Sequence, residues 1–190
     1  MAAEEPEFMT RKKDGDFALR EYPPLVVAET TVKGAFDEVS NQGFRLLAAY
    51  IFGANQGSKK ISMTAPVNQN KDEGEKIKMT APVGLEKSGS ESWRITFTMP
   101  KGYTLDTLPK PNDPRVVLKQ IPAQRFAAVE YSGTWSEDRY NEQRLKLETW
   151  IRLNGLESTG AATFARYNPP WTPWFLRRNE VLIPVVEKKP

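Results

Sequence analysis

The chain has 190 residues, of which 39% are hydrophobic and 27% are charged, a composition typical of a folded domain with its own core. The excess of 27 lysines and arginines over 24 acidic residues is too small to indicate a nucleic-acid partner, and no apolar run is long enough to cross a membrane. Cysteine and histidine are absent, which excludes disulfides, thiol nucleophiles and histidine as a general base or metal ligand.

The first eight residues are acidic and polar, so they do not form an intact secretory signal. We expect a disordered tail at residues 1–13, followed by one monomeric domain at residues 14–187. This indicates a cytoplasmic location for the chain as it stands, and a periplasmic one if a precursor carried a signal peptide.

The chain contains an internal repeat. Residues 19–34 and 118–133 align at a constant offset of 99, and the match continues into the segments that follow. Chance similarity of hydrophobic pattern is the alternative, but the identities include a proline and a glycine, which have special backbone roles. The identical pairs are Leu19/Leu118, Pro23/Pro122, Ala28/Ala127, Gly34/Gly133 and Leu46/Leu145. We expect two related halves, at about residues 17–100 and 116–187.

Each half begins with two runs of strand-forming residues separated by proline. In the first half these are residues 17–21 and 26–32, and in the second half residues 116–120 and 125–131. Each half then reaches a glycine and an aromatic residue, after which the pattern predicts a helix.

The second helix is predicted over residues 136–153. Thr134 and Glu137 have the spacing of a capping box, and Ser136 is a rival N-cap. Leu147 lies on the predicted core face, and Gly155 is a natural stop. The outer face carries charged residues typical of solvated surface: Arg139, Glu142, Arg144, Lys146 and Glu148.

The first helix is predicted over residues 36–52, and it is apolar on two faces. One stripe predicts the core contact: Phe36, Val39, Leu46, Leu47 and Tyr50. A second apolar arc contains Phe44, Ala48, Ile51 and Phe52. This arc is either buried or exposed as a binding patch, and the pattern alone favours burial.

The segments between and after the halves are predicted as strands and loops. A motif at residues 61–67 recurs at 77–83, and both copies are predicted as strands ended by proline, around a polar loop at 68–76. Residues 93–99 alternate as a strand does. Strands are also predicted at 163–167 and 180–186, on either side of a proline-rich loop.

Several linked motifs resemble the SOUL family of haem-binding proteins. The C-terminal run YNPPWTP at residues 167–173, followed by RRNEV at 177–181, is similar to the family's C-terminal signature. The run KMTAPV at 78–83 is similar to its central motif, and FGAN at 52–55 resembles the end of its first helix. The likeness spans residues 14–187.

The resemblance implies an α+β fold: a distorted antiparallel barrel or sheet with two helices, a pseudo-twofold duplication, and similarity to bacterial effector-binding domains. It also implies reversible binding of haem or a related tetrapyrrole on the first helix, without catalysis. The implied contact residues are Asn41, Phe44, Arg45, Ala48, Ala49, Ile51 and Phe52, with Trp171 and Trp174 as a stacking platform.

This sequence departs from the family pattern at the cofactor edge. Asn41 and Ala49 stand where some relatives place basic residues near the haem propionates, and Arg45, one turn from Asn41, can substitute. Some relatives are proposed to use a histidine ligand, which this chain lacks, so axial ligation by histidine is excluded.

Other interpretations of single residues remain open. Met63, Met79 and Met99 can ligate iron through sulfur, although methionine more often fills a core. Tyr50 and Tyr167 can bind ferric iron as phenolates, although buried tyrosines more often form hydrogen bonds.

Glu180 is a candidate catalytic or effector-binding carboxylate, although an ion pair with Arg177 or Arg178 is favoured. Trp171 and Trp174 either stack on a ligand or pin a rigid loop.

Two other functions compete with haem carriage. An effector-binding module for other apolar molecules would place a carboxylate at the floor of a cleft between the halves. A hydrolase or a haem-degrading enzyme would need acid–base chemistry from Glu or Tyr, since no nucleophile–base pair is visible.

Overall fold

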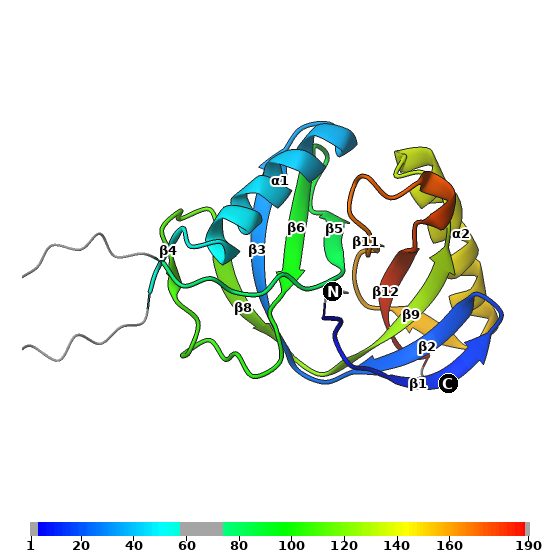
Figure 1. Ribbon diagram of the computed structural model, residues 1–190. Helices are drawn as coiled ribbons and strands as arrows, with labels where there is room; N and C mark the ends of the chain where they lie inside the picture. The colour runs from blue at the N-terminus through cyan, green and yellow to red at the C-terminus, as the bar shows by residue number, and fades with distance from the viewer. Residues whose placement is uncertain (1–3, 58–73, 189–190) are drawn as a thin grey trace, which may run out of the picture.

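The computed structural model describes residues 4–57 and 74–188, and these build one antiparallel sheet that carries two helices (Figure 1). The strand order is β1-β2-β9-β12-β11-β5-β6-β3-β8, and β10 pairs with β12. A separate two-stranded ribbon joins β4 to β7. Strands β1 and β8 form opposite edges, so the sheet is open: of the two expected forms, the distorted antiparallel sheet is confirmed and the closed barrel is not.

The elements have the following bounds. The strands are β1 (Met9–Asp14), β2 (Phe17–Tyr22), β3 (Leu25–Lys33), β4 (Asn55–Gln56), β5 (Val83–Lys87), β6 (Ser92–Thr98), β7 (Lys110–Pro111), β8 (Val117–Ile121), β9 (Gln124–Tyr131), β10 (Leu156–Ser158), β11 (Thr163–Arg166) and β12 (Asn179–Glu187). The helices are α1 (Phe36–Ile51), α2 (Glu137–Leu153) and the short 3₁₀-helix η1 (Trp174–Leu176).

The register of the sheet repeats the offset found in the sequence. Ala18 of β2 pairs with Ala128 of β9, and Val117 of β8 pairs with Glu29 of β3. Ala18 and Val117 are 99 residues apart, and so are Glu29 and Ala128. The two pairs therefore occupy equivalent positions in the repeat. The first strand of each half therefore pairs with the second strand of the other half.

Proline marks the crossing point in both halves. Pro23 and Pro24 separate β2 from β3, and Pro122 lies between β8 and β9. Because proline has no backbone N–H, the ladder breaks there and the chain passes from one half of the sheet to the other.

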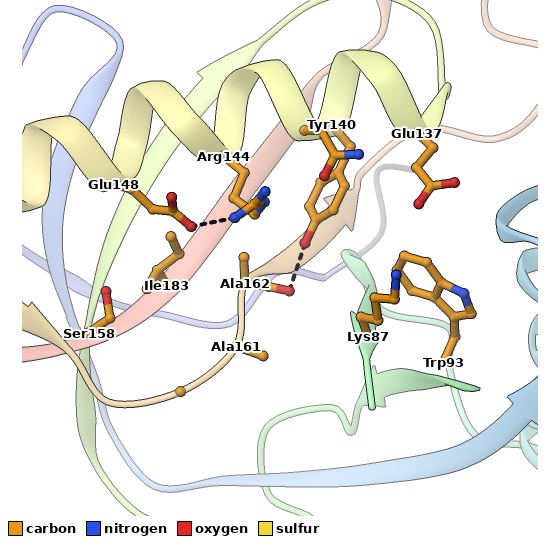
Figure 2. Close-up of a pocket in the computed structure, with 12 residues that line it drawn as sticks. Lys87, Trp93, Glu137, Tyr140, Arg144, Glu148, Ser158, Ala161, Ala162 and Ile183 are labelled. Atoms are coloured by element: carbon orange, nitrogen blue, oxygen red, sulfur yellow. Dashed lines mark hydrogen bonds and ion pairs between the residues drawn. The ribbon is translucent and has the colours of Figure 1, made fainter. Parts of the chain in front are cut away.

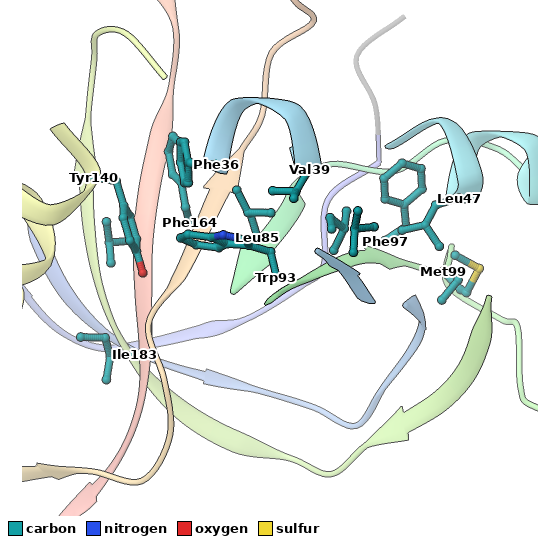
Figure 3. Packing of buried hydrophobic residues seen from close by; sticks show 14 of the residues in the cluster. Phe36, Val39, Leu47, Leu85, Trp93, Phe97, Met99, Tyr140, Phe164 and Ile183 are labelled. Carbon is teal, nitrogen blue, oxygen red and sulfur yellow. The ribbon is translucent and has the colours of Figure 1, made fainter. Parts of the chain in front are cut away.

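Each helix covers its own half of the sheet, and the core is continuous between them. Helix α1 packs on β3 and β6, whereas α2 packs on β9, β10 and β12. Phe36 of α1 joins the halves, because its ring lies 5.1 Å from Trp93 and 5.9 Å from Phe164 (centroid to centroid). Figure 3 shows this row of aromatic and aliphatic side chains running across the molecule. The junction beneath Phe36 is therefore filled with side chains.

Three local expectations were wrong. Residues 9–14 are not a disordered tail, because they form β1 and pair with β2. Residues 77–82 are not a strand: β5 starts only at Val83, after Pro82, which cannot donate to a ladder. The cap of α2 is Ser136, whose hydroxyl accepts from the Arg139 N–H, and not Thr134. The other copy of the tandem motif, at 61–67, lies outside the described residues, as does most of the 68–76 loop.

Candidate functional site

Helix α1 lies close to the sheet because Gly43 faces β6. A Cβ atom at Gly43 would stand 2.5 Å from Cδ1 and 2.9 Å from Cβ of Ile95, so a larger side chain would push the helix away. The helix ends where Gly53 takes a φ of 116°, a conformation that glycine adopts without steric cost.

The FGAN motif at residues 52–55 fixes the C-terminus of α1 through hydrogen bonds of Asn55. The Asn55 amide donates to the carbonyls of Tyr50 and Glu75, both at 2.8 Å, and its oxygen accepts from the Glu75 N–H at 2.9 Å. A buried asparagine thereby satisfies one of the last carbonyls of the helix and fixes the direction in which the chain leaves.

The exposed stripe of α1 differs from the predicted arc. Ile51 is only 1% exposed and belongs to the core, so its assignment as a ligand residue was wrong. Phe44 is half-buried, with its ring 5.5 Å from that of Phe97. The predicted contact residues that reach the exposed surface are Asn41, Arg45, Ala49 and Phe52, and Ala48 is half-buried at the edge. The stripe is polar in its first half and apolar in its last turn.

A groove runs beside that apolar turn, and it has a volume of about 580 Å³. The helix contributes Leu46, Ala49 and Tyr50, and the loop at residues 112–116 forms the opposite wall. Backbone hydrogen bonding holds the wall in place, since the Asn112 N–H donates to the Ala54 carbonyl at 3.2 Å. No local pattern in the sequence predicts this wall, because the loop lies some 60 residues from the helix along the chain.

One ion pair stands on the rim of the groove. The Arg115 guanidinium donates to both Asp113 carboxylate oxygens, and its hydrogen bonds hold the Asp113 pKa at about 2. Arg45, one turn before Ala49 on the exposed stripe, supplies a second cation on this side of α1.

The tyrosine and methionine candidates for iron ligation are engaged in other contacts. Tyr50 donates its hydroxyl proton to the Pro109 carbonyl at 3.0 Å, and burial raises its pKa to about 12. Burial and the charge of Glu180 likewise raise the pKa of Tyr167 above its ordinary value. Met99 is buried and Met79 packs against the core, whereas Met63 lies outside the described residues. Phenolate ligation is therefore disfavoured at both tyrosines.

Trp171 and Trp174 belong to a different surface. Their side chains are 84% and 59% exposed, so they do not pin the loop that carries them. Arg177 does so, donating to the carbonyls of Thr172 and Pro170 at 2.8 and 2.9 Å. Figure 1 places this orange-red segment near α2, well apart from the cyan end of α1. The nine predicted residues therefore do not form one site.

Glu180 is fully buried, and its main partner is Arg20. The two Arg20 nitrogens donate to its carboxylate oxygens at 2.7 and 3.1 Å, and the Tyr167 hydroxyl donates at 2.7 Å. Burial lowers the Arg20 pKa, but the Glu180 carboxylate outweighs this and leaves the pKa above its ordinary value. The predicted ion pair with Arg178 is also present, at 3.5 Å. The shorter contacts come from Arg20, which the sequence did not indicate.

A pocket of about 350 Å³ opens beside α2, and three of its polar side chains, Tyr140, Arg144 and Glu148, take part in hydrogen bonds (Figure 2). Arg144 donates to Glu148 at 2.6 Å, and the Tyr140 hydroxyl donates to the Ala162 carbonyl at 3.0 Å. On the outer face, Glu142 accepts from both Arg139 and Lys146 at 2.7 Å. The second helix therefore presents the charged, solvated surface that its sequence predicts.

The whole chain matches one family model, described as SOUL heme-binding protein, over residues 3–184. The chain belongs to the SOUL heme-binding protein family. Heme-binding protein 1 of Xenopus laevis is 27% identical over 172 residues, a match that covers 90% of this chain and 84% of that one. Heme-binding protein 2 of Homo sapiens is 27% identical over 176 residues, covering 87% and 80%.

Solved structures share the fold of this SOUL family member at low sequence identity. The C-terminal domain of EcmrR has a TM-score of 0.64 and 15% identity, covering 90% of this chain and 97% of that one. A hydrolase from Listeria innocua has a TM-score of 0.59 and 13% identity, covering 98% and 94%. These likenesses confirm the α+β fold with two helices. No helix in the described residues has the length and apolar character needed to span a membrane.

Proposed function

We propose that this protein binds haem reversibly on the last turns of α1 and in the adjoining groove. The observation that carries the proposal is the exposed Ala49, which lines a groove together with Leu46 and Tyr50. Phe52, three residues farther along, is also exposed. Exposed apolar patches on soluble domains usually mark binding sites, and about 580 Å³ is within the range of small-molecule pockets. Membership of the family supports haem as the ligand.

The small Ala49 side chain would let a flat macrocycle lie against the helix. Arg45 would then reach a propionate at the ring edge through a charge-assisted hydrogen bond. Arg115 is the weaker candidate for this role, because Asp113 already neutralises it.

The residues present fit the macrocycle and its carboxylates better than they fit the iron. The chain has no histidine, and Tyr50 keeps its proton and its bond to Pro109. The residues at the groove therefore bind and orient the ring without a strong axial bond. Metal-free protoporphyrin should bind within about tenfold of haem, a difference of about 1.4 kcal/mol.

Titration with haemin and with metal-free protoporphyrin, followed by visible absorption, tests the proposal. We expect saturable changes with both and no low-spin spectrum. A low-spin spectrum typical of two strong protein ligands would contradict weak ligation, and an unchanged Soret band at high micromolar protein would contradict haem binding.

We infer carriage and not catalysis because the buried acid Glu180 is already paired, and because Tyr50 and Tyr140 donate their hydroxyl protons to backbone carbonyls. Glu180 is held by Arg20 and Tyr167, so it is not free to act as a base or to receive a cationic effector. A carrier returns its tetrapyrrole unchanged after incubation and extraction, and recovery of a modified product would contradict this. The monomeric state, the compartment and the lack of a nucleic-acid partner remain predictions.

A further inference from the structure

The residues that precede β1 lie across the junction between the two halves (Figure 1). Glu4 pairs with Thr80 as in a parallel sheet, and its carbonyl accepts from the Ala81 N–H at 2.8 Å. The Glu4 carboxylate accepts from the Lys101 N–H, also at 2.8 Å. This end of the segment is therefore bound to the first half by its backbone and by its charge.

The other end of the segment contacts residues from β2 and from the second half. The Glu5 carboxylate accepts two hydrogen bonds from Arg178, at 3.1 and 2.8 Å. The Phe8 ring lies 4.4 Å from the Arg20 guanidinium carbon and 5.2 Å from the Tyr22 ring. Between them, Glu7 pairs with Lys101 at 2.9 Å.

The segment covers the buried ion pair without becoming part of the core. Beneath it, Arg20 is paired with Glu180, and Arg178 lies 3.7 Å from the Tyr167 ring. The Glu7 side chain is 75% exposed, and Phe8 is 38% exposed. The segment lies on the surface, and its acidic side chains each meet a donor. In this respect it resembles a bound peptide more than a structural strand.

We propose that the surface beneath residues 4–8 binds an extended acidic segment of another polypeptide, and that the chain's own residues 4–8 occupy it as an internal competitor. This surface combines one strand-like backbone contact, two cationic side chains and an aromatic platform. Backbone pairing gives affinity in such sites, and the side-chain contacts give specificity. The partner it fits has two or three acidic residues followed by an aromatic one.

Residues 4–8 limit access to the surface that they cover. It is joined directly to β1, so its effective concentration is on the order of millimolar, and an outside peptide must displace it. Because the contacts are largely between exposed charges, binding should weaken as salt rises.

Deletion of residues 1–8, which leaves β1 intact, tests the proposal. The probe is a fluorescent peptide with the sequence of residues 4–8, Glu-Glu-Pro-Glu-Phe. We expect saturable binding to the truncated chain and binding to the full chain that is at least about tenfold weaker. A peptide with glutamine in place of each glutamate, and one with alanine in place of phenylalanine, should each bind the truncated chain several-fold more weakly.

Two substitutions in the truncated chain compare a residue that contacts the segment with a residue on a distant surface. Arg178→Gln should weaken peptide binding by about tenfold or more, whereas Arg144→Gln on α2 should leave it unchanged. In the full chain, Glu5→Lys should raise peptide affinity by releasing the internal segment. A folded truncated chain that binds none of these peptides would overturn the proposal. So would a truncated chain that cannot fold, because the segment would then be an integral part of the structure.

Discussion

Glu180 and Arg20 form a buried ion pair between β12 and β2, which belong to different halves and flank β9, and each depends on the other. Removing one partner leaves an uncompensated charge in the interior, which typically costs about 3–5 kcal/mol. We therefore expect Arg20→Ala to lower the free energy of unfolding by about that amount in urea denaturation.

A matched arginine on the surface provides the control. Arg125 pairs with Glu187 at 2.8 Å, but both side chains are well exposed. Exposed pairs contribute about 0–1 kcal/mol, so Arg125→Ala should be nearly neutral. Equal losses for the two variants would show that burial of Glu180 carries no special cost.

Ala49 gives the sharpest test of the proposed haem surface. It is exposed and lines the groove, so Ala49→Glu should abolish haem binding by placing a carboxylate against the ring, while the melting temperature stays within a few degrees. Arg45→Ala should weaken binding by about 1–2 kcal/mol, the contribution of one charge-assisted hydrogen bond. Haemin titration and thermal unfolding measure the two effects.

Two leucines on the second helix provide controls for that test. Leu145 is 56% exposed and Leu147 is fully buried. Leu145→Glu should leave both stability and haem binding intact, whereas Leu147→Glu should unfold the domain. Normal haem binding by folded Ala49→Glu would place the ligand elsewhere.

At the scale of the element, α1 depends on close contact between its backbone and β6. Alanine is the better helix former by about 1 kcal/mol, yet Gly43→Ala should destabilise the protein because the new methyl group would overlap Ile95. Overpacking of this kind typically costs about 1–3 kcal/mol. Urea denaturation should show the loss.

A double-mutant cycle identifies the cause. Ile95→Ala removes most of the atoms that meet the new methyl group, so the double variant should be more stable than the sum of the single effects predicts. Strict additivity would mean that Gly43 is required for some reason other than space.

The motifs that reveal the family also act at the scale of elements. Asn55 fastens the end of α1, and Asn179 joins β12 to the start of the second helix by accepting from the Trp135 indole at 2.7 Å. The hydroxyl of Thr80 donates to the Thr98 carbonyl on β6. These side chains bond to backbone and to one another. They specify how strands and helices are joined, which explains why they predict the fold.

At the scale of the whole molecule, all six tyrosines share one property. Burial raises the pKa of every one above its ordinary value, to about 12 for Tyr50 and Tyr140. The unfolded chain loses these protons near pH 10, while the folded chain keeps them. Folding therefore binds more protons in this range, so stability falls as pH rises above about 10.

Spectrophotometric titration provides the measurement. We expect little tyrosinate absorption at about pH 10, where free tyrosine is half ionised, and then a cooperative rise together with loss of the folded signal. A gradual rise centred near pH 10 in a protein that stays folded would contradict the burial of these hydroxyls.

The sequence by itself determined the duplication, both helices and the main strands. These follow from local patterns: a repeat offset of 99, a proline between paired strands, and apolar residues spaced for one helical face. The same patterns indicated that the second helix is solvated outside and that Glu180 pairs with its near neighbour Arg178. Such features depend on neighbours along the chain, so periodicity and residue type are enough to predict them.

Tertiary structure alone decided which residues meet across the chain. Ile51 and Ala49 are both apolar and two positions apart, yet the orientation of α1 on the sheet buries one and exposes the other. Arg20 became the partner of Glu180 because the exchanged strands bring positions 160 residues apart together. Long-range contacts likewise place the groove wall at 112–116 beside α1 and hold residues 4–8 against Arg178 and Lys101. Burial and long-range pairing depend on how elements pack, and no local pattern records that.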